Sequence, residues 1–191
     1  IKHKNILEVE LESLFSNLFE FNFEKGKVIK DITYKSTKNL DLKLDIYQPL
    51  YKEAPAPNKN PVIIHTHGGS FVRGNKEELM EIKPLLKIFL NKGWSVVSIN
   101  YRVINKHNNF PDNIEDVKDS IRWVRKNAEQ YSFDPQKVGI MGHSAGGNLA
   151  LIAGLTENNK FYGNKNLKSF SSKVDFIISY SGPTKFFETE D

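Results

Sequence analysis

The sequence predicts a three-layer α/β fold, in which a mostly parallel sheet lies between helices. Short runs of apolar, often β-branched residues alternate with longer segments in which apolar residues recur every three or four positions. This alternation of strands with helices is typical of a parallel sheet. With 191 residues, of which 39% are hydrophobic and 26% are charged, the chain can form one domain with a sizeable core. Such sheets bind ligands beyond the carboxyl ends of their strands, so a site is expected in the loops there.

An amphipathic helix is predicted first. Leucines recur at steps of three and four residues over 5–20, and Asn5 with Glu8 resembles a capping box. The polar face carries glutamates rather than basic residues, which favours packing on the domain over binding to a membrane. We therefore divide the chain into an N-terminal helix, residues 1–24, and a main α/β domain, residues 25–191.

The remaining elements follow in a regular order. Alternating residues over 28–34 and 40–47, on either side of the turn 36–39, predict an antiparallel hairpin. Residues 54–58 contain two prolines and predict a loop. Strands are then expected at 61–66, 94–101, 137–142 and 174–180, and helices at 76–91, 112–131 and 145–156.

A serine stands between two glycines where a strand gives way to a helix. Gly142-His143-Ser144-Ala145-Gly146 follows the apolar strand 137–142 and enters the helix 145–156. Glycines at 142 and 146 remove side chains that would clash across such a tight turn, so the Ser144 hydroxyl can be exposed at its apex. We predict Ser144 to be a nucleophile, supported in this turn by Gly142, His143 and Gly146. A generic glycine turn with a buried serine is the structural alternative.

A second glycine motif follows the strand 61–66. In His67-Gly68-Gly69-Ser70-Phe71, paired glycines free the backbone N–H groups to point at a ligand. Acyl transfer needs such donors at the developing oxyanion. We predict an oxyanion hole formed by backbone N–H groups of Gly68, Gly69, Ser70 and Ala145. The alternative is a turn that only starts the next helix.

Both motifs belong to a wider resemblance. It is carried in order by His67 to Phe71, Phe110 to Asp112, Asp134 to Val138 and Gly142 to Ala150. Together these segments resemble the α/β-hydrolase esterases, and more narrowly the hormone-sensitive-lipase-like and acetyl-esterase (carboxylesterase) branch, from about residue 41 to 184. The resemblance implies hydrolysis of short acyl, acetyl-like esters through a serine acyl-enzyme, with a small-molecule ester substrate and no cofactor.

The chain departs from the family pattern at two positions. Ser70 replaces a glycine that is common in the oxyanion loop, which should be tolerated because the donor is the backbone. Lys185 stands where related acetyl esterases often carry an acid, which leaves the substrate open.

Charge and composition exclude several classes of function. The net charge of +4 comes from scattered lysines without a basic run, so no nucleic-acid partner is expected. The absence of cysteine excludes disulfides and thiolate metal sites but leaves the compartment undetermined. No apolar stretch approaches the roughly 18 residues that span a bilayer.

Serine catalysis also needs a base, and histidine is the usual residue in that role. His65 and His67 share one side of a strand but have no third ligand nearby, so no metal is expected. His67 is interpreted as support for the oxyanion loop, as the resemblance implies, and His65 as a core histidine. His143 can hardly swing back to the oxygen of its neighbour Ser144. His107, in a loop at the carboxyl edge, is a weak alternative base.

No histidine follows Ser144, although α/β-hydrolases carry the acid and the histidine after the serine. Glu188, Glu190 and Asp191 are weak candidates for the acid, and Asp175 precedes its strand at the wrong end. The strand 174–180 is apolar on both faces, as an interior strand would be. We therefore expect a partial α/β-hydrolase domain that lacks its C-terminal strands, completed by a C-terminal portion or a complementary chain and nearly inactive without it.

Two other functions stay open at the level of sequence. A non-catalytic hydrolase-like module would keep the pocket for binding, which the absence of a downstream histidine favours. A peptidase on the same fold would use the same serine. Labelling by a fluorophosphonate discriminates the first, and comparison of ester with peptide substrates discriminates the second.

Overall fold

The computed structural model describes residues 26–49 and 59–184. The predicted helix over 5–20, the loop 54–58 and the three acids after residue 187 lie outside the described residues.

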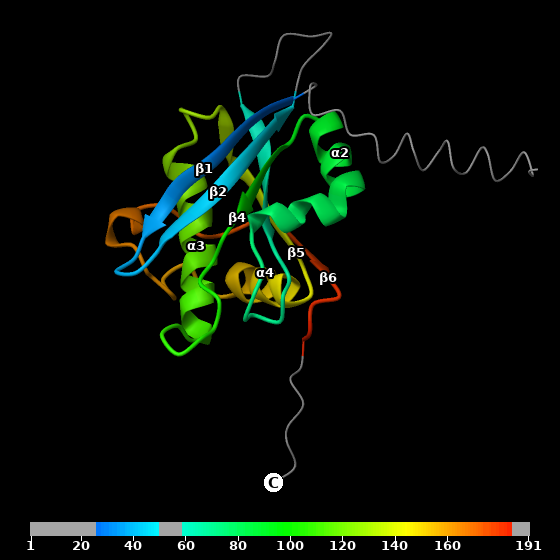
Figure 1. The fold of residues 1–191 in the computed structure, drawn as a ribbon. Coiled ribbons are helices and arrows are strands. Elements are labelled where there is room, and N and C mark those ends of the chain that lie inside the picture. Colours follow the sequence, from blue (N-terminus) through cyan, green and yellow to red (C-terminus); the bar gives the residue numbers. More distant parts are fainter. Residues whose placement is uncertain (1–25, 50–58, 185–191) are drawn as a thin grey trace, which may run out of the picture.

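The sheet has six strands in the order β1-β2-β4-β3-β5-β6 (Figure 1). β3, β4, β5 and β6 are mutually parallel, whereas β1 and β2 form an antiparallel pair whose second strand runs antiparallel to β4. The predicted hairpin and the mostly parallel sheet are therefore confirmed. The strands are β1 (Gly26–Ser36), β2 (Asp41–Pro49), β3 (Asn60–Thr66), β4 (Ser95–Ile99), β5 (Phe133–His143) and β6 (Phe176–Tyr180).

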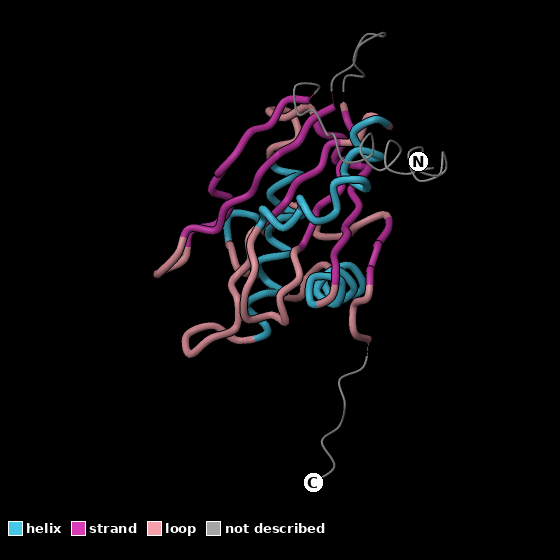
Figure 2. Tube along the Cα trace, turned by 45° about the vertical axis from the view of Figure 1, so that its right-hand side comes forward, coloured by secondary structure: helices cyan, strands magenta, loops and turns pink. Residues whose placement is uncertain are grey.

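Helices cover both faces of this sheet, which confirms the three-layer α/β prediction (Figures 1 and 2). Neighbouring strand residues point to opposite faces. Val62 and Ile64 therefore pack with α3 and α4, while Ile63 packs with η2 and α2. The helical segments are η2 (Lys76–Ile82), α2 (Lys83–Asn91), α3 (Phe110–Lys126), α4 (Ala145–Leu155) and the short η3 (Lys165–Leu167).

Two predicted helices have different bounds in the structure. The segment predicted as one helix over 76–91 is a 3₁₀ helix followed by an α-helix, with Pro84 in the first turn of the latter. Proline has no N–H to donate to the preceding turn, so it suits the start of a helix and not its interior. The helix predicted over 112–131 is α3, which begins earlier because the Asp112 carboxylate accepts the Asn109 N–H at 2.8 Å. It ends at Lys126, and residues 127–131 form separate turns.

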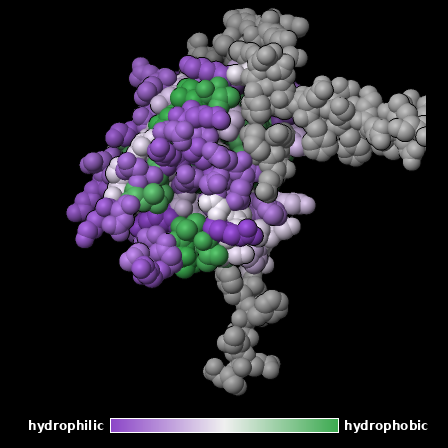
Figure 3. All heavy atoms as spheres, viewed as in Figure 1, coloured by the Kyte–Doolittle hydropathy of each residue, from purple (hydrophilic) through white to green (hydrophobic). Residues whose placement is uncertain are grey.

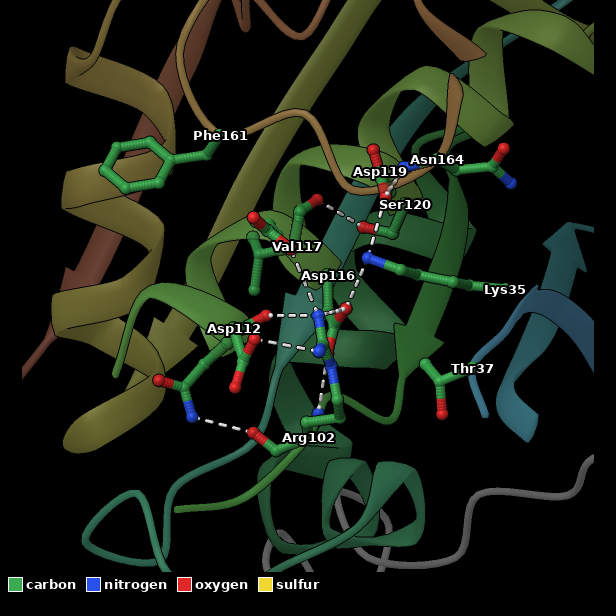
Figure 4. Close-up of polar contacts among 12 residues, drawn as sticks. Lys35, Thr37, Arg102, Asp112, Asp116, Val117, Asp119, Ser120, Phe161 and Asn164 are labelled. Carbon is green, nitrogen blue, oxygen red and sulfur yellow. Dashed lines mark hydrogen bonds and ion pairs between the residues drawn. The ribbon is translucent and has the colours of Figure 1, made fainter. Parts of the chain in front are cut away.

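A buried ionic cluster joins α3 to β1 and to the segment after β4 (Figure 4). Lys35 Nζ lies 2.6 Å from Asp116 and 2.8 Å from Asp119, and both carboxylates are fully buried. Asp116 also receives two hydrogen bonds of 2.8 Å from the Arg102 guanidinium. Arg122, itself buried, contacts Asp119 at 2.9 Å. The cluster fixes α3 against the sheet near the carboxyl ends of the strands.

β6 lies at the edge of the sheet and, within 26–49 and 59–184, pairs only with β5. Its residues are half-buried, and Tyr180 is 67% exposed. The sequence pattern of 174–180 is that of an interior strand, and an edge position is what we expected for it in a partial domain that lacks its C-terminal strands.

The face of the molecule seen in Figure 3 is mainly hydrophilic, with separate hydrophobic patches. Among the residues that the structure describes, no helix is both long enough and apolar enough to cross a bilayer.

Candidate active site

Ser144 occupies a strained turn between β5 and α4. Its φ of 52° and ψ of −121° lie in a region that non-glycine residues seldom adopt. The turn is held on both sides, because the Ser144 N–H donates to the Tyr180 carbonyl at 2.9 Å and the Ser144 carbonyl accepts the Asn148 N–H at 3.1 Å. Ser144 itself is half-buried. This conformation is that of a serine held at the tip of a strand-to-helix turn.

The glycines of this turn pack directly against backbone. A Cβ on Gly142 would collide with the Gly146 carbonyl, and one on Gly146 would collide with the carbonyls of Thr66 and His67. The Thr66 hydroxyl lies 2.8 Å from the Gly146 carbonyl and 3.0 Å from the Met141 carbonyl, and it bridges the two arms of the turn. Glycine at 142 and 146 thus lets the turn approach the end of β3 closely.

The loop after β3 turns with an unusual run of left-handed residues. Gly69, Ser70 and Phe71 have φ values of 101°, 54° and 65°. The Gly69 carbonyl accepts the N–H groups of Val72 and Arg73, both at 3.1 Å. Turns of this kind can form concave nests of backbone N–H groups that suit an anion.

The two loops meet. They lie at the same end of the sheet in Figures 1 and 2, and a Cβ built on Gly68 would be 3.7 Å from the Ser144 Cβ and 3.3 Å from His143 Nδ1. Within the described part of the chain, the N–H groups of Gly68, Gly69 and Ser70 donate to no other protein group. Ala145 is the first residue of α4, and the first N–H groups of a helix have no partner inside it.

His67 supports this loop from within. Its Nδ1 lies 2.8 Å from the Gly68 carbonyl, which can only accept, so Nδ1 carries the proton. The ring stacks on Tyr101 with centroids 4.1 Å apart and is 1% exposed. Burial lowers the pKa of His67 to about 4, so the ring is neutral at neutral pH.

Comparisons with known proteins place the chain in a family. The model of the family described as BD-FAE matches residues 44–191. The chain belongs to the BD-FAE family. Probable carboxylic ester hydrolase LipM of Mycobacterium tuberculosis is 33% identical over 131 residues, which are 69% of this chain and 30% of that protein. Esterase LipC of the same organism is 34% identical over 122 residues, or 64% of this chain and 30% of that protein.

A solved structure matches over most of the described fold. The thermophilic esterase Est2 of Thermogutta terrifontis, with butyrate bound, superposes with a TM-score of 0.69 and 28% identity, over 84% of this chain and 55% of that one. The fold of the BD-FAE chain is therefore the α/β-hydrolase fold of esterases, as the resemblance implied. The chain spans 30% of the length of both curated relatives.

His65, two residues before His67, is buried in the core and hydrogen-bonded to Ser98. The Ser98 hydroxyl donates to the Lys76 carbonyl at 2.7 Å, so His65 Nδ1 must be the donor in its 3.0 Å contact with Ser98. Burial lowers the pKa of His65 to about 3. No group of three or more His, Cys, Asp or Glu side chains among the described residues has the arrangement of a metal site.

None of the histidines that the structure describes is hydrogen-bonded to Ser144. Over 26–49 and 59–184, no side chain makes a hydrogen bond to Ser144 Oγ. His143 lies beside Tyr180, with ring centroids 5.4 Å apart, and His107 is exposed in the loop after β4. Asp175 directly precedes β6, at the amino end of that strand and away from the serine, and its carboxylate accepts the Val138 N–H at 2.7 Å.

Sequence reasoning missed three residues that hold the serine turn and the glycine loop in place. Thr66 ends β3 and Tyr101 follows β4, and this position at the carboxyl edge of buried strands is the signal that could have found them. The Asn148 amide donates to the Pro183 carbonyl at 2.7 Å and ties α4 to the segment after β6. No local pattern marks such a contact, because its partner lies 35 residues away.

Proposed function

We propose that the protein is a carboxylic ester hydrolase that works through an acyl-enzyme on Ser144. The observation that carries the proposal is the convergence of the serine turn with the glycine loop, seen in the 3.7 Å from a Gly68 Cβ to the Ser144 Cβ. The names of the relatives as esterases support it. A serine in a strained turn has no evident use in a protein that only binds.

The proposed reaction has two steps. Ser144 Oγ attacks the ester carbonyl carbon while a histidine takes its proton. The bond from the acyl carbon to the alcohol oxygen then breaks, the alcohol leaves with that proton, and the acyl group stays on Oγ. Water then attacks the acyl-enzyme, and the acid and the free serine are released. In both steps the oxyanion rests on N–H groups of Gly69, Ser70 and Ala145, with Gly68 beside them. Each such donor is worth about 3 to 4 kcal/mol to the transition state.

We further propose that the base and its acid come from polypeptide outside these 191 residues. His65 and His67 are buried and already donate elsewhere. The sequence has no histidine after Ser144. A serine without its base loses about 10⁶ in kcat, or roughly 8 kcal/mol, so residues 1–191 by themselves would be nearly inert.

The substrate we propose is an ester with a short, acetyl-like acyl chain. The family resemblance favours it, and the Est2 structure with bound butyrate agrees with a short acyl group.

The test compares Ser144→Ala with a matched serine variant in the full natural polypeptide. Ser132 is the control, because it is likewise a serine with positive φ (55°), but it is exposed and precedes β5 at the opposite end of the sheet. We expect Ser144→Ala to lose p-nitrophenyl acetate hydrolysis by about 10⁶-fold and to lose fluorophosphonate labelling, and Ser132→Ala to keep both. Labelling is read on a gel and hydrolysis by absorbance.

The outcomes separate the other functions. A wild-type protein that is neither labelled nor active would contradict the proposal and favour a binding module. A labelled protein that cleaves a peptide but not the ester would favour a peptidase.

A further inference from the structure

Tyr101 lies beneath the glycine loop, although no step of the reaction above uses it. It follows β4 by two residues and is 3% exposed. Its Oη donates to the His67 carbonyl at 2.9 Å, and the Gly68 carbonyl is also within reach at 3.3 Å. Two consecutive carbonyls of the loop therefore face one hydroxyl.

The hydroxyl stays a donor under ordinary conditions. Burial raises the pKa of Tyr101 well above its usual value, with a further contribution from the negative charge of Glu78. Two carbonyl oxygens can only accept, so the phenol proton is directed at them.

The orientation of these carbonyls fixes the orientation of two N–H groups. In a trans peptide the C=O of one residue and the N–H of the next point in opposite directions. The peptides of this loop are trans. Holding the His67 carbonyl toward Tyr101 therefore turns the Gly68 N–H away from it, and holding the Gly68 carbonyl does the same for the Gly69 N–H.

His67 acts on the same peptide units from the side. Its Nδ1 proton binds the Gly68 carbonyl at 2.8 Å, and its ring stacks on Tyr101 at an interplanar angle of 11°. The loop is also tied further along, where the Ile104 N–H donates to the Phe71 carbonyl at 2.7 Å. The segment after β4 thus holds the loop at its start and at its turn.

We propose that Tyr101 is a positioning residue that aims the N–H groups of Gly68 and Gly69 at the oxyanion. The proposal rests on the proposed esterase function and assigns to Tyr101 no contact with the substrate. Glycine peptides rotate easily, so without the hydroxyl the two units would lose their fixed orientation. The effect should fall on the transition state, where the oxyanion exists, more than on substrate binding.

Tyr101→Phe tests this directly, because it removes Oη and keeps the ring that stacks on His67. The matched control is Tyr34→Phe. Tyr34 is also buried, at 4% exposed, and its hydroxyl donates at 2.6 Å to a backbone carbonyl of the same segment, that of Asn100. Both variants lose a tyrosine hydroxyl that donates to backbone carbonyl oxygen, but only the hydroxyl of Tyr101 contacts the glycine loop.

In the full polypeptide we expect kcat of Tyr101→Phe for p-nitrophenyl acetate to fall about 10- to 100-fold, with KM within about twofold of wild type. The rate of labelling by a fluorophosphonate should fall with it. Tyr34→Phe should keep wild-type kcat, while urea unfolding shows a similar loss of stability in both variants.

Equal kcat in the two variants, or a change confined to KM, would overturn the role of Tyr101 and leave the proposed function standing. A wild-type protein without hydrolysis or labelling would overturn the proposed function, and this inference with it.

Discussion

At the scale of single residues, the backbone of Ser144 is kept in a left-handed conformation by packing on both sides. A non-glycine residue there costs of order 1 to 3 kcal/mol, which the surrounding contacts must offset. Those contacts need bare backbone at 142 and 146, where a Cβ would meet carbonyl oxygens. The strained conformation of Ser144 therefore depends on the close backbone packing at Gly142 and Gly146.

Gly146→Ala tests this packing. We expect a loss of about 1 to 3 kcal/mol in the free energy of unfolding, with slower fluorophosphonate labelling, because backbone carbonyls cannot move aside for the new methyl group. The matched control is Gly154→Ala in the same helix, where the methyl group would meet side-chain atoms of Ile177 and Val174. Those side chains can rotate, and alanine favours the helix by about 1 kcal/mol, so the control should stay near wild type. Equal losses in the two variants would argue against a special role for the turn.

The sequence was informative about these residues to different degrees. Ser144, Gly142 and Gly146 could be predicted because strand, turn and helix are adjacent in the chain. Tyr101 could not, because its role depends on β4 lying beside β3 in a particular register, which brings residues 33 positions apart together.

At the scale of elements, α3 is attached to the sheet by charge as well as by apolar contacts. Asp116 and Asp119 are fully buried and share Lys35, and Arg102 completes the cluster from the segment after β4 (Figure 4). A buried charge that loses its partner keeps its desolvation cost. The helix periodicity of α3 was visible in the sequence. The partners of its acids were not, because they come from β1 and from the segment after β4.

Asp116→Asn removes one charge from this cluster. We expect a loss of about 3 to 5 kcal/mol in the free energy of unfolding, because the buried Lys35 and the half-buried Arg102 then have one carboxylate fewer. Lys137→Gln is the control, since its contact with Asp134 is long, at 3.8 Å, and Lys137 is 68% exposed. That variant should stay within about 0.5 kcal/mol of wild type in urea unfolding. An Asp116 variant as stable as the control would show that the cluster contributes little.

At the scale of the whole molecule, the sheet order places both glycine loops at one end because β3 and β5 are parallel neighbours. The three-layer fold was predictable from the alternation of elements. The strand order was not predictable, because the chain places β4 on one side of β3 and then returns to place β5 on the opposite side of β3. The division of the predicted helix 76–91 into a 3₁₀ helix and an α-helix was also not predictable, because the pattern of apolar residues does not distinguish the two geometries.

The two buried histidines make global stability depend on pH. Burial lowers the pKa of His65 to about 3 and of His67 to about 4, below the ordinary value of 6.5 in the unfolded chain. Between pH 6.5 and 4 the unfolded state therefore binds more protons, and stability falls as the pH falls. Each histidine contributes up to about 1.4 kcal/mol per pH unit in that window.

We expect His65→Asn to reduce that slope in urea titrations at pH 4.5 to 6.5 by up to about 1.4 kcal/mol per pH unit. His107→Asn, at an exposed position, should leave the slope unchanged. An unchanged slope in His65→Asn would contradict the assignment of a neutral, buried imidazole.

The most direct test of the convergence of the two loops is a crystal structure of the full polypeptide after reaction with a fluorophosphonate. The account predicts phosphorus bonded to Ser144 Oγ, with a phosphonyl oxygen about 2.7 to 3.1 Å from the amide nitrogens of Ala145 and of Gly69 or Ser70. An adduct on another residue, or a phosphonyl oxygen on Ser144 that points away from those amides, would contradict it.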